Sequence, residues 1–382
     1  MNKLLFLAIA LLTAGCKEKF ISPAPTVVTG YLVIEGVVNN GGGQTNIRLS
    51  RTTKLTDTAK IYENGAFLEL EDNRNNKIPF SESGNGNYSV ENLQLDTSLR
   101  YRLNISTANN ENYQSDFVAV NNNPPIDSIN WIQDNNGVQL YVNTNDPKNS
   151  THYYQWEYNE AWEIHSGYYS LLKWATKIGP DNTQLATVAY RDSSDAQIFV
   201  CYQYNPSNRI IVGTSAKLAQ DIIHLPLTQI PTNDRKIGVL YSILVRQYSW
   251  SKQGYEFLER MKKNTETIGS IFDPQPSELN SNFHCISNQL QPVIGFLNIC
   301  SVKEKRIFIK NRDLLNWDYR APCSDQIIYN ISDSIKLSAF GTFPVQPVKE
   351  DPFGNIITFN IASPLCVDCR LSGTNIKPPY WP

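Results

Sequence analysis

The amino-acid sequence predicts a mostly β protein, in which a small N-terminal β-sandwich is followed by a larger β-rich domain that carries one α-helix. Three observations support this fold class. The chain holds 20 tyrosines and 7 tryptophans, and aromatic residues favour strands. Apolar and polar side chains alternate along many short segments. Asparagine and glycine are frequent in the polar turns between those segments.

The first sixteen residues are typical of an export signal. Lys3 precedes an apolar run over residues 4–12, and small residues then lead to Cys16. The run is shorter than the roughly 20 apolar residues of a membrane-spanning helix, so residues 1–16 are interpreted as a signal peptide. Its end resembles the bacterial lipobox, which implies cleavage before Cys16 and lipidation of its thiol. An ordinary signal peptide with an incidental cysteine is the alternative.

Lipidation of Cys16 would make a membrane the first partner of the chain. Lys17 follows Cys16, in place of the aspartate that favours retention in the inner membrane in similar lipoproteins, so we expect the outer membrane. Residues 17–26, which contain two prolines, would form a tether. The periplasmic and the external face of that membrane are both compatible with the sequence.

Composition limits the classes of partner and the number of domains. Of 382 residues, 41% are hydrophobic and 18% are charged, and the formal net charge is -2. The chain therefore lacks the basic surface that nucleic-acid binding requires. Its length exceeds what one hydrophobic core usually organises, and Pro124 with Pro125 interrupts the strand pattern. We expect two domains, at residues 27–122 and 126–382.

The first expected domain consists of short alternating segments. In residues 31–38, Leu32 and Ile34 share one face of an expected strand. Turns rich in glycine and asparagine follow at residues 41–43, 64–65 and 84–87. Turns at this spacing predict a small β-sandwich. The segments between the turns carry alternating apolar residues at Ile47 and Leu49, at Leu68 and Leu70, and at Tyr101, Leu103 and Ile105.

The second expected domain continues the β pattern and adds one helix. Residues 134–137, Asp-Asn-Asn-Gly, are a hairpin turn signal. Over residues 250–264, Tyr255, Leu258 and Met261 recur at helical spacing. We expect this helix to pack its apolar stripe onto the parent domain, and a binding groove is the alternative. Strands are expected at residues 126–133, 138–142, 153–165, 198–204, 237–248, 293–299, 306–309 and 356–361.

Six cysteines follow Cys16, all in the second half of the chain. An even number in an exported protein indicates disulfides, and six cysteines allow 15 pairings. The Cys-x-x-Cys at Cys366 and Cys369 could instead serve redox chemistry or form half of a zinc site, but a disulfide is the favoured interpretation. We expect at least one of these two to pair with a distant cysteine. The candidate disulfide cysteines are Cys201, Cys285, Cys300, Cys323, Cys366 and Cys369.

The best candidate for ligand contact is the expected strand at residues 153–165. Its alternation places Trp156, Glu160 and Trp162 on one face, with Glu163 and His165 on the other. The aromatic side chains around Glu160 could stack a sugar or another planar ligand. Glu163 and His165 could transfer protons in a suitable cleft. The alternative that we favour is a half-buried strand whose aromatic residues fill the core.

No known catalytic, metal or cofactor motif stands out in the sequence. A Gly-x-Ser-x-Gly elbow, a phosphate-binding loop, a His-Glu-x-x-His pair and a dinucleotide fingerprint are absent. We therefore expect no cofactor and no metal, and we assign no catalytic residue.

Several stretches together resemble a known family. They are residues 33–36, 241–248 and 269–277, and the tail from Cys366 to Trp381. These stretches are similar to the domain of unknown function 4249 family, a group of Bacteroidota lipoproteins without an established activity, and the similarity extends over essentially the whole mature chain. Family members are often encoded beside TonB-dependent outer-membrane receptors, which implies a role in an envelope uptake or surface complex. The N-terminal region is also similar to the carboxypeptidase-regulatory type of sandwich, which implies binding or bracing.

The sequence thus predicts an outer-membrane lipoprotein that acts as a non-catalytic binding or accessory subunit. The expected partners are the membrane, a TonB-dependent receptor or another envelope protein, and a glycan or small nutrient. One alternative is an envelope glycan hydrolase that uses Glu160 or Glu163 together with a second carboxylate. The other alternative is a structural assembly factor.

Overall fold

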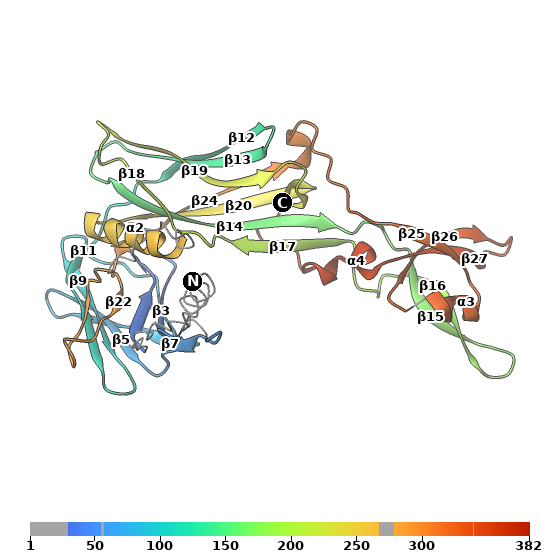
Figure 1. The fold of residues 1–382 in the computed structure, drawn as a ribbon, viewed down its shortest axis with the longest axis horizontal. Coiled ribbons are helices and arrows are strands. Elements are labelled where there is room, and N and C mark those ends of the chain that lie inside the picture. Colours follow the sequence, from blue (N-terminus) through green and yellow to red (C-terminus); the bar gives the residue numbers. More distant parts are fainter. Residues whose placement is uncertain (1–29, 55–56, 267–278, 339) are drawn as a thin grey trace, which may run out of the picture.

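The computed structural model describes residues 30–54, 57–266, 279–338 and 340–382. The protein is mostly β, as the sequence predicts, and it is elongated (Figure 1). One group of sheets contains the first strands, a second group lies beside it, and a smaller lobe extends to the opposite end. We name these parts the N-terminal module (residues 30–121 and 279–302), the central module (126–166, 199–266 and 303–320) and the distal lobe (167–198 and 321–371).

Two sheets that share one hydrophobic core build the N-terminal module. The first has the strand order β22-β1-β3-β8-β7, with β4 beside β3, and the second has the order β21-β10-β9-β5-β6, with β11 beside β9. Their strands are β1 Leu32–Glu35, β3 Gln44–Arg51, β4 Ile61–Tyr62, β5 Phe67–Asp72, β6 Lys77–Pro79, β7 Ser81–Gly84, β8 Asn87–Glu91, β9 Arg100–Ser106, β10 Asn112–Ser115, β11 Val118–Ala119, β21 Phe283–Cys285 and β22 Ile294–Gly295.

The predicted alternation in this module is confirmed, with one interruption. Leu32, Leu49 and Leu103 point into the shared core. The expected strand at residues 31–38 is broken at Gly36, where φ is +134° and a Cβ atom would lie 2.4 Å from the carbonyl oxygen of Asn46. Only glycine tolerates both conditions. The chain therefore forms β1 and then a separate short strand, β2 (Val38–Asn39).

Residues from late in the chain complete the N-terminal module. β22 pairs with β1 in parallel, and β21 pairs with β10 in antiparallel orientation. β23 (Ile299–Cys300) pairs with β2 in parallel. The side chains of Phe283, Val293 and Leu297 lie in the same core as those of the first strands. The N-terminal module is therefore assembled from two segments that are far apart in the sequence.

In the central module, two sheets pack around a second core. One sheet has the order β12-β13-β19, and the other has the order β17-β14-β20-β24, with β18 beside β14. The predicted turn at residues 134–137 joins β12 to β13, since Asp134 pairs with Gly137. The strands are β12 Ile126–Asp134, β13 Gly137–Asp146, β14 Tyr153–His165, β17 Val200–Pro206, β18 Ile211–Thr214, β19 Asp221–Pro231, β20 Leu240–Ser249 and β24 Lys303–Lys310, with short 3-10 turns η1 Arg235–Ile237 and η2 Asn311–Asp313.

The predicted helix is present as α2 (Lys252–Glu266). The hydroxyl of Ser251 accepts a hydrogen bond from the backbone N–H of Gly254 at the start of the helix, as capping side chains do. Tyr255 and Leu258 are buried, and Met261 packs against the same apolar cluster. The apolar stripe therefore packs on the protein itself. No helix in the described ranges combines the length and the apolar character needed to cross a membrane.

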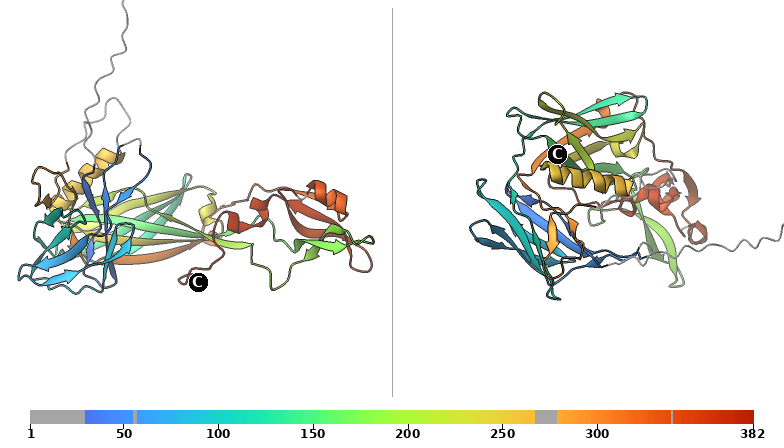
Figure 2. Two further views of the ribbon diagram at one scale, coloured as in Figure 1. Left: turned by 90° about the horizontal axis from the view of Figure 1, so that it is seen from below. Right: turned by 60° about the vertical axis from the view of Figure 1, so that its left-hand side comes forward.

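The distal lobe contains a hairpin, a three-stranded sheet and short helices, and Figure 2 shows how far it projects from the rest of the molecule. The hairpin pairs β15 with β16, and the sheet has the order β25-β27-β26. Its elements are β15 Leu172–Ile178, β16 Gln184–Tyr190, β25 Asp325–Tyr329, α3 Ser332–Ser338, β26 Phe343–Glu350, β27 Ile356–Ala362, α4 Pro364–Val367 and η3 Cys369–Leu371.

Two disulfides hold the root of this lobe. Cys201 of β17 bonds to Cys369, 168 residues later, and Cys323 bonds to Cys366. Cys369 thus pairs with a distant cysteine, as expected. Cys285 and Cys300, which the sequence analysis also named as disulfide candidates, are free and buried. That part of the disulfide prediction is corrected, because the fold places Cys285 on β21 beside β10 and Cys300 on β23 beside β2, in two different sheets.

Candidate functional site

The residues that the sequence suggested for ligand contact lie on β14 and mostly face the core. Trp156 is fully buried, and its indole N–H donates to Gln247 Oε1 over 2.9 Å. Glu160 is 1% exposed. Trp162 is also buried, although it borders a shallow cavity of about 410 Å³. The structure thus places Trp156 and Glu160 out of reach of a ligand at the surface, and it agrees with the alternative of a packed strand.

Glu160 belongs to a closed network of charges and hydrogen bonds. Lys236 Nζ lies 2.7 Å from Glu160 Oε2, and Asn205 donates to the same oxygen over 3.0 Å. The hydroxyl of Tyr241 donates to Glu160 Oε1 over 2.8 Å. Burial, followed by the nearby Glu160 charge, raises the pKa of Tyr241 well above its usual value. Both carboxylate oxygens are therefore bonded within the fold, and Glu160 serves to hold the central sheet together.

The opposite face of β14 holds the predicted pair of Glu163 and His165. Their side chains are 2.8 Å apart, between Oε1 and Nε2, and the indole N–H of Trp381 donates to Glu163 Oε2 over 3.0 Å. The hydrogen bond with His165 lowers the pKa of Glu163, against the effect of burial. The pair lines a cavity of about 370 Å³, together with Arg235 and Arg320. Among the described residues that line this cavity, Glu163 is the single carboxylate.

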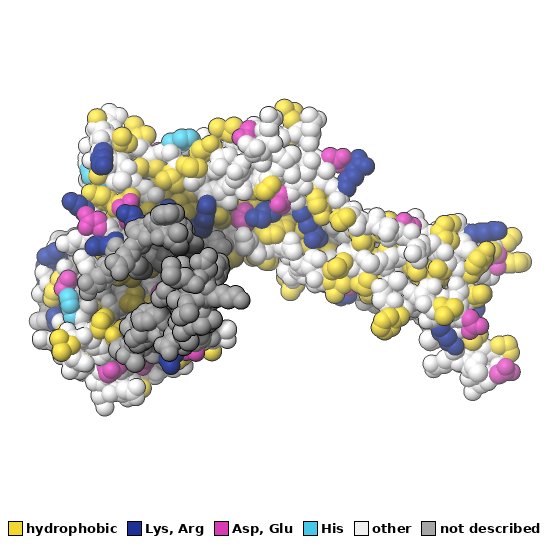
Figure 3. All heavy atoms as spheres, viewed as in Figure 1, with side chains coloured by type: hydrophobic (Ala, Val, Ile, Leu, Met, Phe, Trp, Pro, Cys, Tyr) yellow, Lys and Arg dark blue, Asp and Glu magenta, His cyan; other side chains and the backbone are white. Residues whose placement is uncertain are grey.

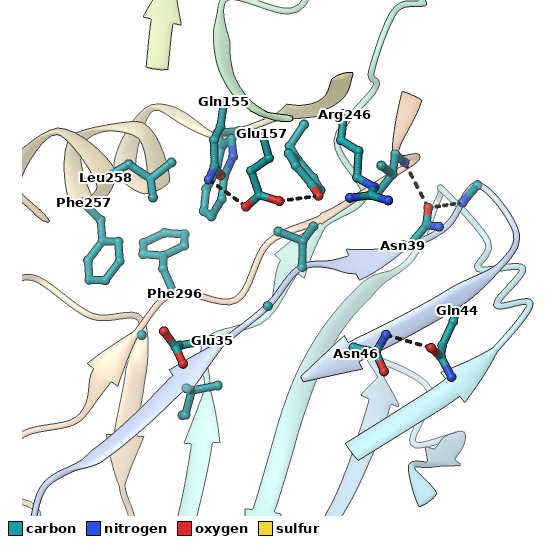
Figure 4. Close-up of a pocket in the computed structure, with 18 of the residues that line it drawn as sticks. Glu35, Asn39, Gln44, Asn46, Gln155, Glu157, Arg246, Phe257, Leu258 and Phe296 are labelled. Atoms are coloured by element: carbon teal, nitrogen blue, oxygen red, sulfur yellow. Dashed lines mark hydrogen bonds between the residues drawn. The ribbon is translucent and has the colours of Figure 1, made fainter. Parts of the chain in front are cut away.

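A larger cavity than these two lies elsewhere, where the N-terminal module meets the central module. Its volume is about 890 Å³. Strands β1 and β3 and the turn at residues 41–43 line one side, and β14, β20, β24 and α2 line the other. We call this space the junction groove. Figure 4 shows residues from both modules pointing into it.

One side of the junction groove is apolar. Phe257 and Leu258 of α2 lie beside Phe296, whose ring centroid is 5.7 Å from that of Phe257. Trp250 also packs on Phe296, with 6.1 Å between the ring centroids. These residues belong to the apolar cluster that joins the two modules. The groove therefore has an apolar wall, in which Trp250 and Phe257 are largely buried and Phe296 is partly exposed.

The other walls are polar and carry more negative than positive groups. Strand pairing sets Glu157, Arg246 and Glu304 side by side across β14, β20 and β24. Arg246 Nε lies 2.6 Å from Glu304 Oε1. The hydroxyl of Tyr248 donates to Glu157 Oε2 over 3.0 Å, and burial, followed by that carboxylate, raises the pKa of Tyr248. The groove is thus lined by three carboxylates and by one guanidinium group. The carboxylates belong to Glu35, Glu157 and Glu304, and the guanidinium group belongs to Arg246.

The N-terminal module contributes amide side chains to the same space. Gln44 and Asn46 stand on the exposed face of β3, and Asn46 donates to Gln44 Oε1 over 2.9 Å. Asn39 ends β2, and its side-chain oxygen accepts a hydrogen bond of 2.8 Å from the backbone N–H of Gly41, which holds the turn at residues 41–43. An apolar wall, amide groups and carboxylates are the features by which binding sites orient small polar ligands.

Sequence reasoning missed the junction groove. Its walls come from residues 33–46, 155–157, 246–261 and 294–304, and no local motif links these segments. Glu157 lies two residues from Asn159 and four from Ala161 on β14, and its side chain is on the strand face that is mostly half-buried. The described residues contain no group of three or more histidine, cysteine, aspartate or glutamate side chains placed to hold a metal ion. Cys16 and the stretch at residues 269–277 lie outside the described residues.

Comparison with protein-family models gives a match over most of the chain. The model of the family described as "Domain of unknown function (DUF4249)" matches residues 18–306. No curated protein sequence shows significant similarity to the chain.

Proposed function

The chain belongs to the domain of unknown function 4249 family, and from this premise we propose that it is an outer-membrane lipoprotein that acts as a non-catalytic binding subunit of an envelope uptake system. The proposed partner is a TonB-dependent receptor or another envelope protein. The observation that carries the binding role is the junction groove of about 890 Å³ between two β modules. Ligand sites occur preferentially at such module interfaces.

The N-terminal sequence supports the proposed location. Lys3, the apolar run and the small residues before Cys16 are typical of a lipoprotein signal. A lipid on Cys16 would confine the chain to the membrane surface, and confinement raises the effective concentration of a partner in the same membrane. A modest intrinsic affinity is then sufficient for a stable complex.

The chemistry of the junction groove favours a neutral, polyhydroxylated ligand such as an oligosaccharide. Gln44, Asn46 and Glu157 offer amide and carboxylate groups that bond hydroxyls. Phe296, which is partly exposed, offers apolar surface for the C–H face of a sugar ring. The excess of carboxylates disfavours anionic ligands, since a like charge in a partly dry site is costly.

The first experiment is affinity capture of the native protein from gently solubilised outer membranes, with mass spectrometry of the proteins that co-purify. We expect a stoichiometric receptor or transporter with the wild-type chain. The Cys16→Ala variant, which would not enter the membrane, is the control. Recovery of the wild-type protein alone would contradict the proposed accessory role.

A second experiment addresses the ligand. Isothermal titration with neutral oligosaccharides is compared between the wild type and the double variant Gln44→Ala/Asn46→Ala. Loss of two hydrogen-bonding side chains should weaken binding roughly tenfold. Gln220→Ala, an exposed amide outside the groove, is the matched control. Equal binding by all three proteins would remove the junction groove as the site.

An envelope glycan hydrolase is the second candidate, and one observation favours it. Glu163 and His165 form a hydrogen-bonded pair at a cavity, which is an arrangement suited to general base catalysis. A two-carboxylate mechanism would require a second acid roughly 5–10 Å from Glu163 across the cavity, and the described lining residues supply no second acid. Glycan cleavage that Glu163→Gln abolishes while leaving the fold intact would establish the hydrolase.

A further inference from the structure

The cavity lined by Glu163 and His165 lies at the root of the distal lobe. The end of β14, the turn η1 with the residues after it, and the chain at residues 319–321, which leads into the lobe, form its walls. We call this space of about 370 Å³ the root cavity, and the described residues that line it all differ from those of the junction groove. Figure 3 shows basic side chains (dark blue) on the visible surface where the central module passes into the distal lobe. The root cavity is thus a second, separate candidate for ligand binding.

The walls of the root cavity are held in place by the disulfide at the root of the lobe. Gly167, which lines the cavity, packs so closely that a Cβ atom there would lie 2.6 Å from Cys323 Sγ. The backbone N–H of Tyr168 donates to the carbonyl oxygen of Cys366 over 2.9 Å, and Cys323 and Cys366 form a disulfide. The segments that lead into the lobe are therefore tied to each other. A preformed cavity loses little conformational entropy when a ligand binds.

The single carboxylate among the described residues of the root cavity is already bonded. Glu163 Oε1 lies 2.8 Å from His165 Nε2, and Glu163 Oε2 accepts a hydrogen bond from the indole N–H of Trp381 over 3.0 Å. Two guanidinium groups, those of Arg235 and Arg320, line the same cavity. The guanidinium groups therefore outnumber the carboxylate, and Glu163 forms an ion pair with neither of them.

Arg235 differs from the other half-buried arginines because its guanidinium group has no partner. In the described parts of the chain, this group makes no hydrogen bond, ion pair or aromatic contact, whereas every other half-buried arginine there is bonded through its guanidinium group. A charged group that is partly removed from water without a partner costs free energy, and an anionic ligand would recover that cost. The bonded arginines are Arg51, Arg102, Arg191, Arg246, Arg260 and Arg306.

Arg320 can supply a second guanidinium group. Its Nη2 lies 3.0 Å from Asp318 Oδ2, but the two side chains are 84% and 65% exposed. An exposed ion pair contributes little free energy, so Arg320 can exchange Asp318 for a ligand at small cost. Arg235 is half-buried, whereas Arg320 is exposed. Arg235 would therefore provide the principal contact to an anion, and Arg320 would add a weaker one.

The ligand that fits these groups is an organic acid. A guanidinium group bonds a carboxylate or a phosphate through two parallel hydrogen bonds. Because Glu163 offsets one of the two guanidinium charges, the remaining charge matches a carboxylate better than a phosphate ester, which carries up to about two negative charges. The volume of about 370 Å³ is many times the roughly 30 Å³ of a water molecule. A carbon skeleton therefore has room beside the half-buried side chains of Tyr319, Val239 and Ala321.

We propose that the root cavity binds a small organic acid, whose carboxylate is held by Arg235 and Arg320 and whose carbon skeleton lies against Tyr319. This ligand differs in charge from the neutral ligand of the junction groove. The inference does not depend on the proposed function, since no residue of the junction groove takes part. It also requires no glycan hydrolysis, because Glu163 acts here as a charged part of the wall that opposes anion binding.

The test is isothermal titration of the full chain with butyrate, succinate and benzoate, each up to about 10 mM. Butyramide, succinamide and benzamide are matched ligands without the charge, and phenyl phosphate replaces the carboxylate of benzoate by a phosphate. The variant Arg235→Gln removes the unpaired guanidinium group. Arg312→Gln is the matched control, at an exposed arginine of η2 outside the root cavity. Circular dichroism verifies the fold of each variant.

We expect at least one carboxylate to bind roughly tenfold or more tightly than its amide, and Arg235→Gln should weaken that binding roughly tenfold because charge-assisted hydrogen bonds are lost. Arg312→Gln should change the affinity by less than about twofold. Binding by none of the carboxylates, equal binding of the amides, or equal losses with the two arginine variants would overturn the inference. Tighter binding of phenyl phosphate than of benzoate would overturn it in favour of a phosphate site.

Glu163→Gln separates this inference from the hydrolase. Removing the like charge from the root cavity should strengthen carboxylate binding roughly threefold, whereas a hydrolase would lose glycan cleavage with the same variant. Weaker carboxylate binding by Glu163→Gln than by the wild type would contradict a carboxylate beside Glu163 in this cavity.

Discussion

Lys236 Nζ and Glu160 Oε2 are 2.7 Å apart inside the central module. The carboxylate is buried, whereas the ammonium group lies near the surface over the ring of Trp162, 5.2 Å from its centroid. The ammonium group of Lys236 thus compensates the buried negative charge of Glu160. Glu160 belongs to β14, which also lines one wall of the junction groove. A residue that looked like a ligand contact in the sequence is a structural element of the fold.

Removing the ammonium group of Lys236 from this ion pair should destabilise the protein. Lys236→Met leaves the Glu160 charge buried, and we expect a loss of about 2–4 kcal/mol in the free energy of unfolding. The double variant Glu160→Gln/Lys236→Met should lose less than the sum of the single variants. Urea unfolding followed by tryptophan fluorescence measures these values. The exposed pair of Lys252 and Glu256 supplies a control, since Lys252→Met should cause no measurable change. If Lys236→Met leaves the free energy of unfolding unchanged, Lys236 does not stabilise the buried charge of Glu160.

The cysteines should differ in reactivity. Burial raises the pKa of Cys300 to about 11, and Cys285 is also buried, so neither thiol should react in the native protein. Without reductant, iodoacetamide should modify both cysteines only after denaturation. The four cysteines of the two disulfides should require reductant as well. Intact-mass measurement counts the added groups, and modification of either free thiol in the folded protein would refute the prediction.

Low pH should lower the free energy of unfolding, because Asp146 becomes protonated. Burial by itself would raise the pKa of this carboxylate, but hydrogen bonds from Ser150, Lys148 and Thr151 outweigh burial and lower the pKa from 3.8 to about 2. A depressed pKa in the folded state stabilises the fold above pH 3.8, and this contribution is lost as the pH falls toward 2. We expect about 1–2 kcal/mol from this group.

The measurement is the free energy of unfolding of the wild type and of Asp146→Asn between pH 2 and pH 6. The difference between the two proteins should be largest above pH 4 and should shrink as the pH falls to 2. A difference that stays constant over this range would show that Asp146 does not titrate with folding.

The lipid anchor gives a prediction for the part of the chain outside the described residues. Cys16→Ala should leave the fold intact but release the protein from membranes, because each buried methylene of an acyl chain contributes about 0.8 kcal/mol to anchoring. Carbonate washing of membranes, followed by immunoblotting, separates the two states. Lys17→Ala, which keeps the cysteine, is the matched control. Recovery of Cys16→Ala in the membrane pellet would contradict lipidation.

Local sequence patterns predicted much of the secondary structure. Alternation with a period of two found β14 at its observed bounds and assigned its buried and exposed faces correctly. Helical spacing of Tyr255, Leu258 and Met261 found α2. Both patterns arise because neighbouring side chains must share one buried face, which is a condition that acts over a few residues. The family was also recognisable from short stretches, and its model matches residues 18–306.

Contacts between distant segments were decided only by the tertiary structure. Fifteen pairings of six cysteines were open, and the fold paired Cys201 with Cys369 and Cys323 with Cys366. It also brought β21, β22 and β23 to the N-terminal strands. Strand partners and register depend on which buried faces fit together over the whole chain, so a single segment does not encode them.

The same distinction applies to function. The sequence by itself determined a mostly β fold and the family, because each depends on residues that are close together in the chain. The export signal ending at Cys16 stays a prediction from the sequence. The junction groove came from the tertiary structure, because it requires residues 33–46 and 246–304 to meet. It is a product of packing between elements, which no short stretch of sequence specifies.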